Sequence, residues 1–134
     1  MKKVLTFSVL LLCLSIFLIG CSGGPGSSIS NEVIDLLESD GYILEERDKD
    51  SVQYYQTNMV NDKYTLDLEI SELYIGYVNE IERWAEIIIF EDFDQASEFY
   101  DELMIEASLG RYVIQEEHII IITFSDETYD IFNS

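Results

Sequence analysis

Residues 84–90 read Trp-Ala-Glu-Ile-Ile-Ile-Phe, and this stretch decides the fold more than any other part of the sequence. Successive side chains of a strand point to opposite sides, so the adjacent residues Ile87, Ile88 and Ile89 put apolar groups on both faces of an extended chain. This pattern is typical of a central strand in a sheet covered on each side, or of a strand with one face at a subunit interface. We therefore expect a sheet with this strand in its interior.

A second apolar stretch lies near the C-terminus. Residues 118–124 read His-Ile-Ile-Ile-Ile-Thr-Phe, which is too apolar for an exposed strand. Residues 111–115 precede it, and we predict that the two segments form a hairpin that turns at Glu116 and Glu117.

Two more strands are expected upstream. In residues 66–70 apolar side chains alternate with acidic ones, which indicates a half-buried strand that continues through residues 74–78. A β-bulge near residues 71–72 or at Gly76 would join the two parts. Residues 42–47, Tyr-Ile-Leu-Glu-Glu-Arg, predict a further strand.

The clearest helix is expected over residues 94–107, with Asp94 as its N-cap and Gly110 after its end. Its apolar residues recur at helical spacing and form one stripe: Ala96, Phe99, Tyr100, Leu103, Met104 and Ala107. Another helix is predicted over residues 31–39, capped by Ser30.

A last short helix is predicted over residues 126–132, capped by Ser125. Phe124 and Tyr129 flank that cap at the positions of a hydrophobic staple.

Residues 50–63 allow two interpretations. Apolar side chains at helical spacing suit a helix capped by Asp50 or Ser51 and ended by Asn61 and Asp62. The alternative is a strand, but one face of that strand would be half polar. We favour the helix.

The expected elements follow the order α-β-α-β-β-α-β-β-α, in which the third element is the ambiguous one. Pairs of strands separated by helices favour an antiparallel sheet. The predicted fold class is therefore α+β: a single small domain over residues 31–134, with a mainly antiparallel sheet and helices packed on it.

The N-terminal segment carries a different signal. Lys2 and Lys3 precede an apolar stretch over residues 4–19, and residues 18–21 read Leu-Ile-Gly-Cys. A positive start, a short apolar stretch and small residues at the cleavage point make up a signal peptide. The segment resembles the signal peptide and lipobox of bacterial lipoproteins. The resemblance implies that the thiol of Cys21 receives a diacylglycerol and that the chain is cut just before this residue.

On this expectation residues 1–20 are the signal peptide, and residues 21–30 are the lipidated cysteine and a flexible tether rich in Ser and Gly. The mature protein would then be held at the cell membrane, on its extracytoplasmic face, by the lipid. An uncleaved membrane-spanning helix is an alternative, although the apolar stretch spans 16 residues and a membrane span needs roughly 20. Secretion with an unmodified Cys21 is another.

The charge of the chain is strongly negative. Seven Lys and Arg residues face 27 Asp and Glu residues, which gives a net charge of −20. Two of the seven, Lys2 and Lys3, precede Cys21, so the mature chain would carry −22. Because nucleic acids and anionic lipid headgroups attract clustered basic residues, we expect neither of them to bind the domain directly. Cationic partners and weakly held divalent cations are favoured, although the acids also serve solubility alone.

The cysteine content excludes several kinds of site. Cys13 would leave with the signal peptide and Cys21 would be lipidated, so no thiol would remain for a disulfide, a zinc site or a nucleophile. We expect the domain to be held together by its hydrophobic core and to use no cofactor.

His118 is the single histidine of the chain. Glu116 and Glu117 precede it, but the sequence shows no further partner for a catalytic triad. We interpret His118 as a strand residue beside a turn.

Two groups of acids resemble metal-ligand sets only loosely. Glu91, Asp92 and Asp94 bring three carboxylates together between a strand and a helix, but the spacing of a calcium-binding loop is absent. We interpret this group as helix capping, and residues 48–50 as a loop in which Asp50 caps the following helix.

Tyrosines crowd the middle of the chain and precede Trp84: Tyr54, Tyr55, Tyr64, Tyr74 and Tyr77. Tyr and Trp are favoured at protein interfaces, whereas strand propensity explains the same residues without a partner. An aromatic face that binds a partner is therefore one hypothesis.

We expect a membrane-anchored, non-enzymatic binding domain whose partner is a protein. The sequence lacks a Gly-rich phosphate loop, a nucleophile elbow and a His-Glu-x-x-His motif. A lipoprotein that binds divalent cations through its acidic surface is an alternative, and a small hydrolase of cell-wall material is a third hypothesis.

Overall fold

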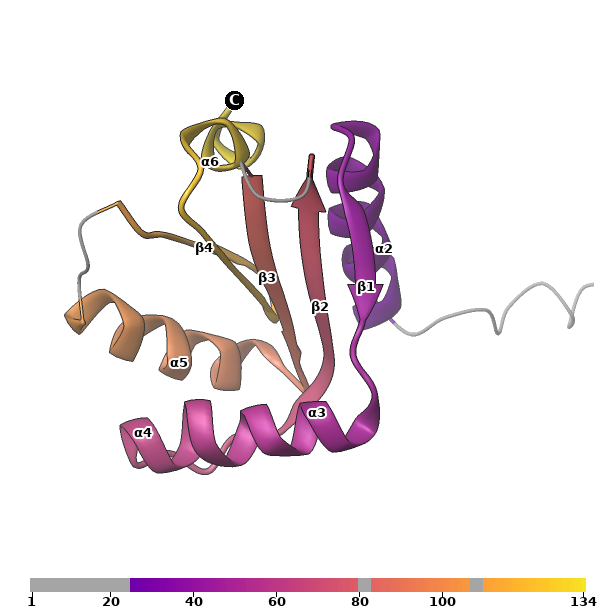
Figure 1. Cartoon of the computed structure of the whole chain (residues 1–134). Helices are drawn as coiled ribbons and strands as arrows, with labels where there is room; N and C mark the ends of the chain where they lie inside the picture. The colour runs from indigo at the N-terminus through magenta and orange to yellow at the C-terminus, as the bar shows by residue number, and fades with distance from the viewer. Residues whose placement is uncertain (1–24, 80–82, 107–109) are drawn as a thin grey trace, which may run out of the picture.

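A five-stranded antiparallel sheet forms the middle layer of the protein (Figure 1). The computed structural model describes residues 25–79, 83–106 and 110–134. The strands lie side by side in the order β1-β2-β3-β5-β4. Their bounds are Ile43–Glu46 for β1, Ile70–Val78 for β2, Arg83–Phe90 for β3, Tyr112–Glu116 for β4 and Ile119–Thr123 for β5.

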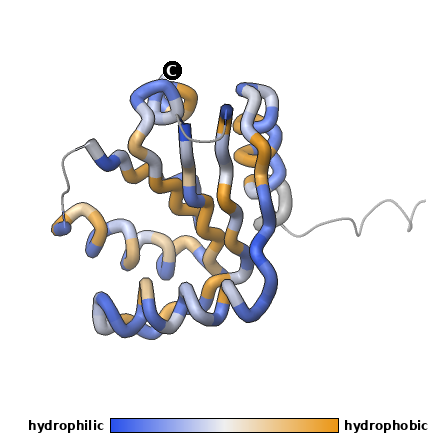
Figure 2. Tube along the Cα trace, viewed as in Figure 1, coloured by the Kyte–Doolittle hydropathy of each residue, from blue (hydrophilic) through white to orange (hydrophobic). Residues whose placement is uncertain are grey.

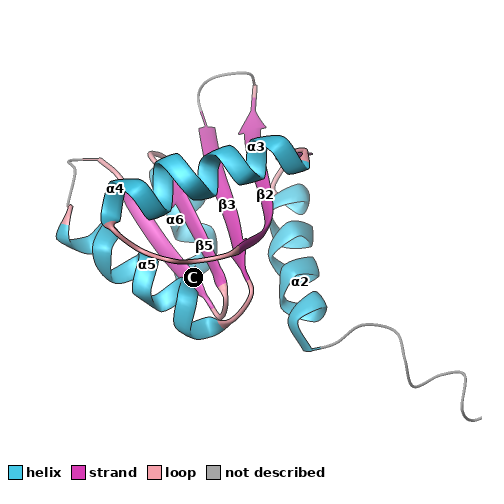
Figure 3. Ribbon diagram, turned by 90° about the horizontal axis from the view of Figure 1, so that it is seen from below, coloured by secondary structure: helices cyan, strands magenta, loops and turns pink. Residues whose placement is uncertain are grey.

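Helices cover both sides of this sheet. On one side, the α2 face, lie α2 (Pro25–Ser39) and α6 (Asp126–Asn133). On the other side, the α5 face, lie α5 (Phe93–Ile105) and a continuous helical run. This run consists of α3 (Lys49–Tyr54), the π-helical segment η1 (Tyr55–Asn61) and α4 (Asp62–Tyr64), and Figure 3 shows it crossing the strands. The arrangement confirms the predicted α+β class and order of elements.

Strand β3 is buried on both faces, as its sequence predicts. Ile88 and Phe90 belong to the core under α5, whereas Ile87 and Ile89 belong to the core under α2. Figure 2 shows apolar residues concentrated in the strands and on the sides of the helices that face them. Each fully buried isoleucine contributes about 1.5–3 kcal/mol of hydrophobic stabilisation. Strand β3 therefore stabilises the cores on both sides of the sheet.

Helix α2 begins earlier than predicted. It starts at Pro25, and Ser30 is not its N-cap but lies inside the helix with only 8% of its surface exposed. Residues 25–30, expected to belong to a flexible tether, are therefore helical. Proline suits the first turn of a helix, and the buried residues Val33 and Leu37 hold the helix on the sheet.

The predicted signal peptide, Cys21 and residues 22–24 lie outside the described residues. Within residues 25–79, 83–106 and 110–134, no helix combines the length and the apolar character needed to span a membrane.

Two helices are capped by an aspartate that lies two residues before the predicted one. Asp48 caps α3 and Asp92 caps α5, and each accepts a hydrogen bond from the backbone N–H three residues later, at 2.8 Å and 2.9 Å. Both caps have extended backbone conformations, which an N-cap requires. The predicted caps Asp50 and Asp94 lie in the first helical turn, where their charge interacts favourably with the helix dipole.

The ambiguous residues 50–63 are helical, as favoured. The helical run does not end at Asn61 but continues to Tyr64, and Thr65 ends it in a left-handed conformation with φ of 59°.

Residues 66–69 do not form a strand, although their apolar and acidic residues alternate. The side chain of Asn61 binds both backbone groups of Leu68: Nδ2 donates to the carbonyl oxygen at 3.0 Å, and Oδ1 accepts from the N–H at 2.9 Å. These bonds replace those of a strand while Leu68 stays buried. Strand β2 begins at Ile70, and the predicted bulge lies between Ile70 and Glu72.

The β4–β5 hairpin turns one residue later than predicted. Glu116 pairs with Ile119, so Glu117 and His118 form the turn, and Glu117 has a φ of 53°. His118 is therefore a turn residue rather than a strand residue.

Ser125 caps α6, as predicted, because its side chain accepts a hydrogen bond from the N–H of Thr128 at 3.3 Å. The predicted staple does not form. Phe124 packs against Trp84, and the ring of Tyr129 stacks on that of Tyr112 with 4.7 Å between the centroids.

Candidate functional site

The helices of the α5 face leave part of the sheet uncovered. Figure 1 shows that α5 and the α3–α4 run cross the lower part of the sheet, whereas the upper ends of β2 and β3 extend beyond them. Five apolar or aromatic residues from β1, β2, β3 and the position after β5 lie on this side of that part of the sheet, which we name the aromatic face: Ile43 and Phe124, which are exposed, and Ile75, Tyr77 and Trp84, which are half-buried.

Strand register explains why these side chains lie together. Tyr77 is paired with Ile43 on one side and with Trp84 on the other, so the three lie in one row across β1, β2 and β3. Phe124 extends the row, with 6.2 Å between its ring centroid and that of Trp84. Ile43 is 57% exposed and Phe124 is 59% exposed, so the two ends of the row are open to solvent.

Glu86 lies at the lower border of the aromatic face. It is two residues after Trp84 in β3, and its neighbours on the adjacent strands are Ile75 and Ile122. The hydroxyl of Tyr55, which comes from the helical run, lies near the Glu86 carboxylate and interacts with it electrostatically. Glu86 is thus the charged residue of the stretch that decides the fold, and it is placed among apolar side chains.

Burial raises the pKa of Glu86, and the Tyr55 hydroxyl opposes this effect only in part. The pKa of Tyr55 is raised as well, first by burial and then by the charge of Glu86. In the described part of the chain, no lysine or arginine forms an ion pair with Glu86. The site therefore holds a partly desolvated carboxylate without a countercharge.

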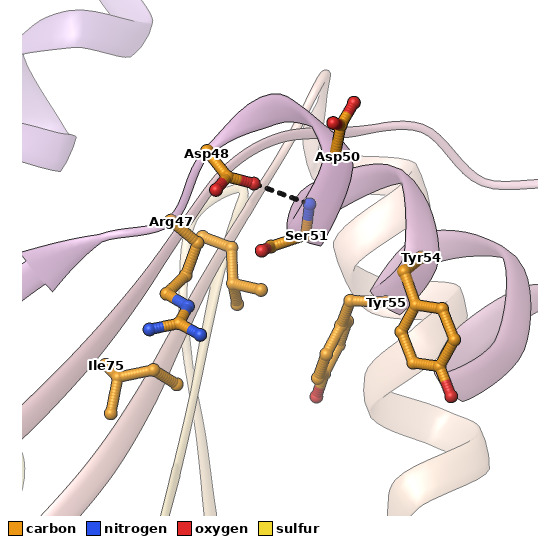
Figure 4. Close-up of a pocket in the computed structure, with 8 residues that line it drawn as sticks. Arg47, Asp48, Asp50, Ser51, Tyr54, Tyr55 and Ile75 are labelled. Carbon is orange, nitrogen blue, oxygen red and sulfur yellow. Dashed lines mark hydrogen bonds between the residues drawn. The ribbon is translucent and has the colours of Figure 1, made fainter.

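A pocket with a volume of about 470 Å³ continues from the aromatic face towards α3. Figure 4 shows Arg47 and Ile75 on one side of it and Tyr54 and Tyr55 on the other, and Leu73 also contributes to its wall. The N-cap bond from Ser51 to Asp48 fixes the start of α3 at its border. The pocket and the aromatic face share Ile75, so they form one continuous surface.

His118 lies in the turn between β4 and β5. Its backbone carbonyl accepts a hydrogen bond from the N–H of Phe90 at 3.0 Å, which closes the end of β3. Among the residues that the structure describes, its imidazole forms no hydrogen bond or ion pair with Glu116 or Glu117.

The acidic groups have structural roles. Asp92 and Asp48 are helix caps, as described above, and Glu91 donates its backbone N–H to the carbonyl of Glu69 at 3.3 Å. A search of residues 25–79, 83–106 and 110–134 finds no group of three or more His, Cys, Asp or Glu side chains able to hold a metal ion.

The structure separates the crowded tyrosines into three environments. Tyr77 lies on the aromatic face, and Tyr54 and Tyr55 line the adjacent pocket. Tyr64 packs edge-on against Phe99 in the α5-face core, with 5.7 Å between the ring centroids. Tyr74 lies on the opposite, α2 face.

Sequence reasoning missed Glu86 and the exposed Phe124. Glu86 is the one charged residue in residues 84–90, and a lone charge inside an apolar strand was the signal that could have identified it. The position of Phe124 next to the Ser125 cap suits a hydrophobic staple, and this local pattern hides its exposure on the sheet.

Comparison of the chain with protein-family models, with curated proteins and with solved structures found no significant match.

Proposed function

We propose that this protein is a lipid-anchored, extracytoplasmic binding domain without catalytic activity, and that its aromatic face binds a protein partner. The observation that carries the binding function is the row of Ile43, Tyr77, Trp84 and Phe124 across an uncovered part of the sheet. Tyr and Trp are enriched in protein interfaces, and exposed apolar patches mark interaction sites.

The anchor is supported by the residues Leu-Ile-Gly-Cys at positions 18–21 and by the apolar stretch before them. A diacylglyceryl group on Cys21 holds a protein stably at a membrane because two acyl chains bury enough CH₂ groups. The domain carries a large negative charge, which disfavours direct contact with anionic headgroups, so the lipid would provide the attachment.

Mass spectrometry of the mature N-terminus tests the anchor. The wild-type chain should begin at a modified Cys21 and fractionate with the membrane, whereas the Cys21→Ala variant should lose the modification. Cys13→Ala is the matched control, since Cys13 lies within the predicted signal peptide. A wild-type chain with an unmodified Cys21, or one that keeps residues 1–20, would contradict the proposal.

Site-specific photo-crosslinking in intact cells tests the binding face. A photoreactive phenylalanine analogue replaces Tyr77 or Phe124 in the full chain. It replaces Ile105 or Leu36 as a control, because these are exposed apolar residues outside the aromatic face. We expect one adduct of defined mass from positions 77 and 124 and none from the control positions. Equal adducts at all four positions, or none at 77 and 124, would contradict the proposed function.

A further inference from the structure

We infer that the partner of the aromatic face presents a basic segment, and that Glu86 accepts a hydrogen bond from a lysine or arginine side chain of that segment. This inference rests on the proposed function and adds the chemistry of the ligand to it. It follows from the position of Glu86, from the aromatic groups beside it and from the charge of the whole domain.

The first argument is the incomplete environment of the Glu86 carboxylate. An ionised carboxylate has about four acceptor positions, and the nearby Tyr55 hydroxyl can fill at most one of them. The neighbours on β2 and β5, Ile75 and Ile122, offer no hydrogen-bond donor from their side chains. A partly buried charge is costly when it has no countercharge. A cationic side chain that reaches Glu86 from the open face would offset this cost.

The second argument is the suitability of the aromatic face for a long basic side chain. Lysine and arginine lay their apolar stems along hydrophobic surfaces while the charged end reaches a polar partner. Trp84 and Tyr77 are paired across β2 and β3, two residues along the strands from Glu86 and its partner Ile75, and the faces of aromatic rings attract cations. Glu45, whose carboxylate accepts a hydrogen bond from the Tyr77 hydroxyl at 3.1 Å, supplies a second negative charge at the border.

The third argument is charge complementarity over a longer range. The chain carries 27 acidic residues against seven basic ones, so its field attracts basic partners and repels acidic ones before contact. A basic protein segment suits the surroundings of Glu86 better than a metal ion does. Calcium takes 6–8 oxygen ligands, whereas the described residues contain no group of three carboxylates or other ligands near Glu86.

Fluorescence of Trp84 provides a direct test, because it is the single tryptophan of the chain. The full chain in detergent micelles is titrated with a capped peptide of alternating lysine and leucine. The same titration is repeated with peptides that carry glutamine or glutamate in place of each lysine. We expect the lysine peptide to change the Trp84 emission saturably, and the glutamine and glutamate peptides to bind at least about tenfold more weakly, as expected for a lost charged hydrogen bond.

The Glu86→Gln variant assigns the effect to this carboxylate. It should weaken binding of the lysine peptide at least about tenfold, and Glu98→Gln should change it by less than about twofold. Glu98 is an exposed glutamate of α5, so the control removes the same charge from another part of the surface.

The outcomes separate this inference from the proposed function. Equal binding of the lysine and glutamine peptides, or no effect of Glu86→Gln, would overturn the inference while crosslinking at positions 77 and 124 still supports a binding face. Absence of any response to the lysine peptide up to about 1 mM, the range of very weak binding, would overturn the inference as well. The proposed function itself is contradicted only by failure of the crosslinking experiment.

Discussion

The side-chain hydroxyls of Tyr42 and Thr128 form a buried hydrogen bond across 86 positions of the sequence. Tyr42 follows α2 and Thr128 lies in the first turn of α6, so the bond joins the two helices of the α2 face through their ends. Arg83, whose guanidinium lies 5.1 Å from the centre of the Tyr42 ring and pairs with Asp40, covers this contact.

Removal of either hydroxyl should destabilise the protein, because the other is left buried without its partner. We expect Tyr42→Phe and Thr128→Val each to lower the free energy of unfolding by about 1–3 kcal/mol. The double variant should lose less than the sum of the two, since both partners are then absent. Urea unfolding of the four proteins measures this, and strict additivity would show that the bond has no energetic role.

Gly76 has no side chain, so the side chains of Leu44 and Tyr42 can lie close to the backbone of β2. A Cβ atom at this position would lie 2.7 Å from Leu44 Cδ2 and 3.1 Å from Tyr42 Cδ1. The Tyr42 ring cannot move freely because Thr128 holds its hydroxyl. We expect Gly76→Ala to lower the free energy of unfolding by about 1–2 kcal/mol through overpacking. The exposed Ser71→Ala in the same strand should change it by no more than about 0.5 kcal/mol.

The N-cap of α5 gives a test with a matched control. Asp92→Ala removes the acceptor of the Gln95 N–H and should cost about 1 kcal/mol of stability. Asp94→Ala removes an equal charge from the first turn and should cost only about 0.3–0.5 kcal/mol, the size of a dipole interaction. Thermal unfolding of both variants distinguishes the two positions, and a larger loss for Asp94→Ala would place the cap there instead.

Much of this fold is predictable because its strands are apolar on defined faces. The two-sided burial of β3 follows from Ile87, Ile88 and Ile89, since no amphipathic pattern accommodates three consecutive isoleucines. The stripe of Ala96, Phe99 and Leu103 predicts α5 for the same reason: its period matches the helix, and all three residues are buried.

One error arises where the side chain of a neighbouring element replaces the hydrogen bonds that a local pattern predicts. Residues 66–69 alternate like a strand, but Asn61 takes both backbone groups of Leu68, and no local pattern reveals that bond. The candidate site was hidden in the same way. Tyr55 comes from a helix and Glu86 from a strand, so burial of that carboxylate becomes visible only when the two elements are packed together.

The raised pKa of Glu86 predicts a pH-dependent effect on stability. The folded state holds the Glu86 proton more tightly than the unfolded chain, so stability falls as the pH rises from the unfolded pKa to the folded pKa. Above the folded pKa, the full destabilisation by the partly buried charge is present. A glutamine at this position carries no charge and does not cause this destabilisation. Glu86→Gln should therefore raise the free energy of unfolding at neutral pH.

The same comparison at lower pH provides the control. The advantage of Glu86→Gln over the wild type should shrink towards about pH 4, near the pKa of an unfolded glutamate, because Glu86 is then neutral as well. Denaturant titrations of both proteins across this range measure the difference. A constant difference, or a variant less stable than the wild type at neutral pH, would show that the Glu86 charge does not destabilise the fold.

Strand β5 comes late in the chain but occupies an interior position, between β3 and β4. Until Ile119–Thr123 has been synthesised, one edge of β3 lacks its partner, and neither core can close. The five-stranded sheet therefore cannot be completed before β5 has been synthesised, and the non-local β3–β5 pairing slows folding further. For a chain that crosses a membrane before it folds, this delay would keep the precursor competent for export. The late position of β5 in the sequence would thus favour the proposed secretion, because the sheet stays incomplete until this strand has been synthesised.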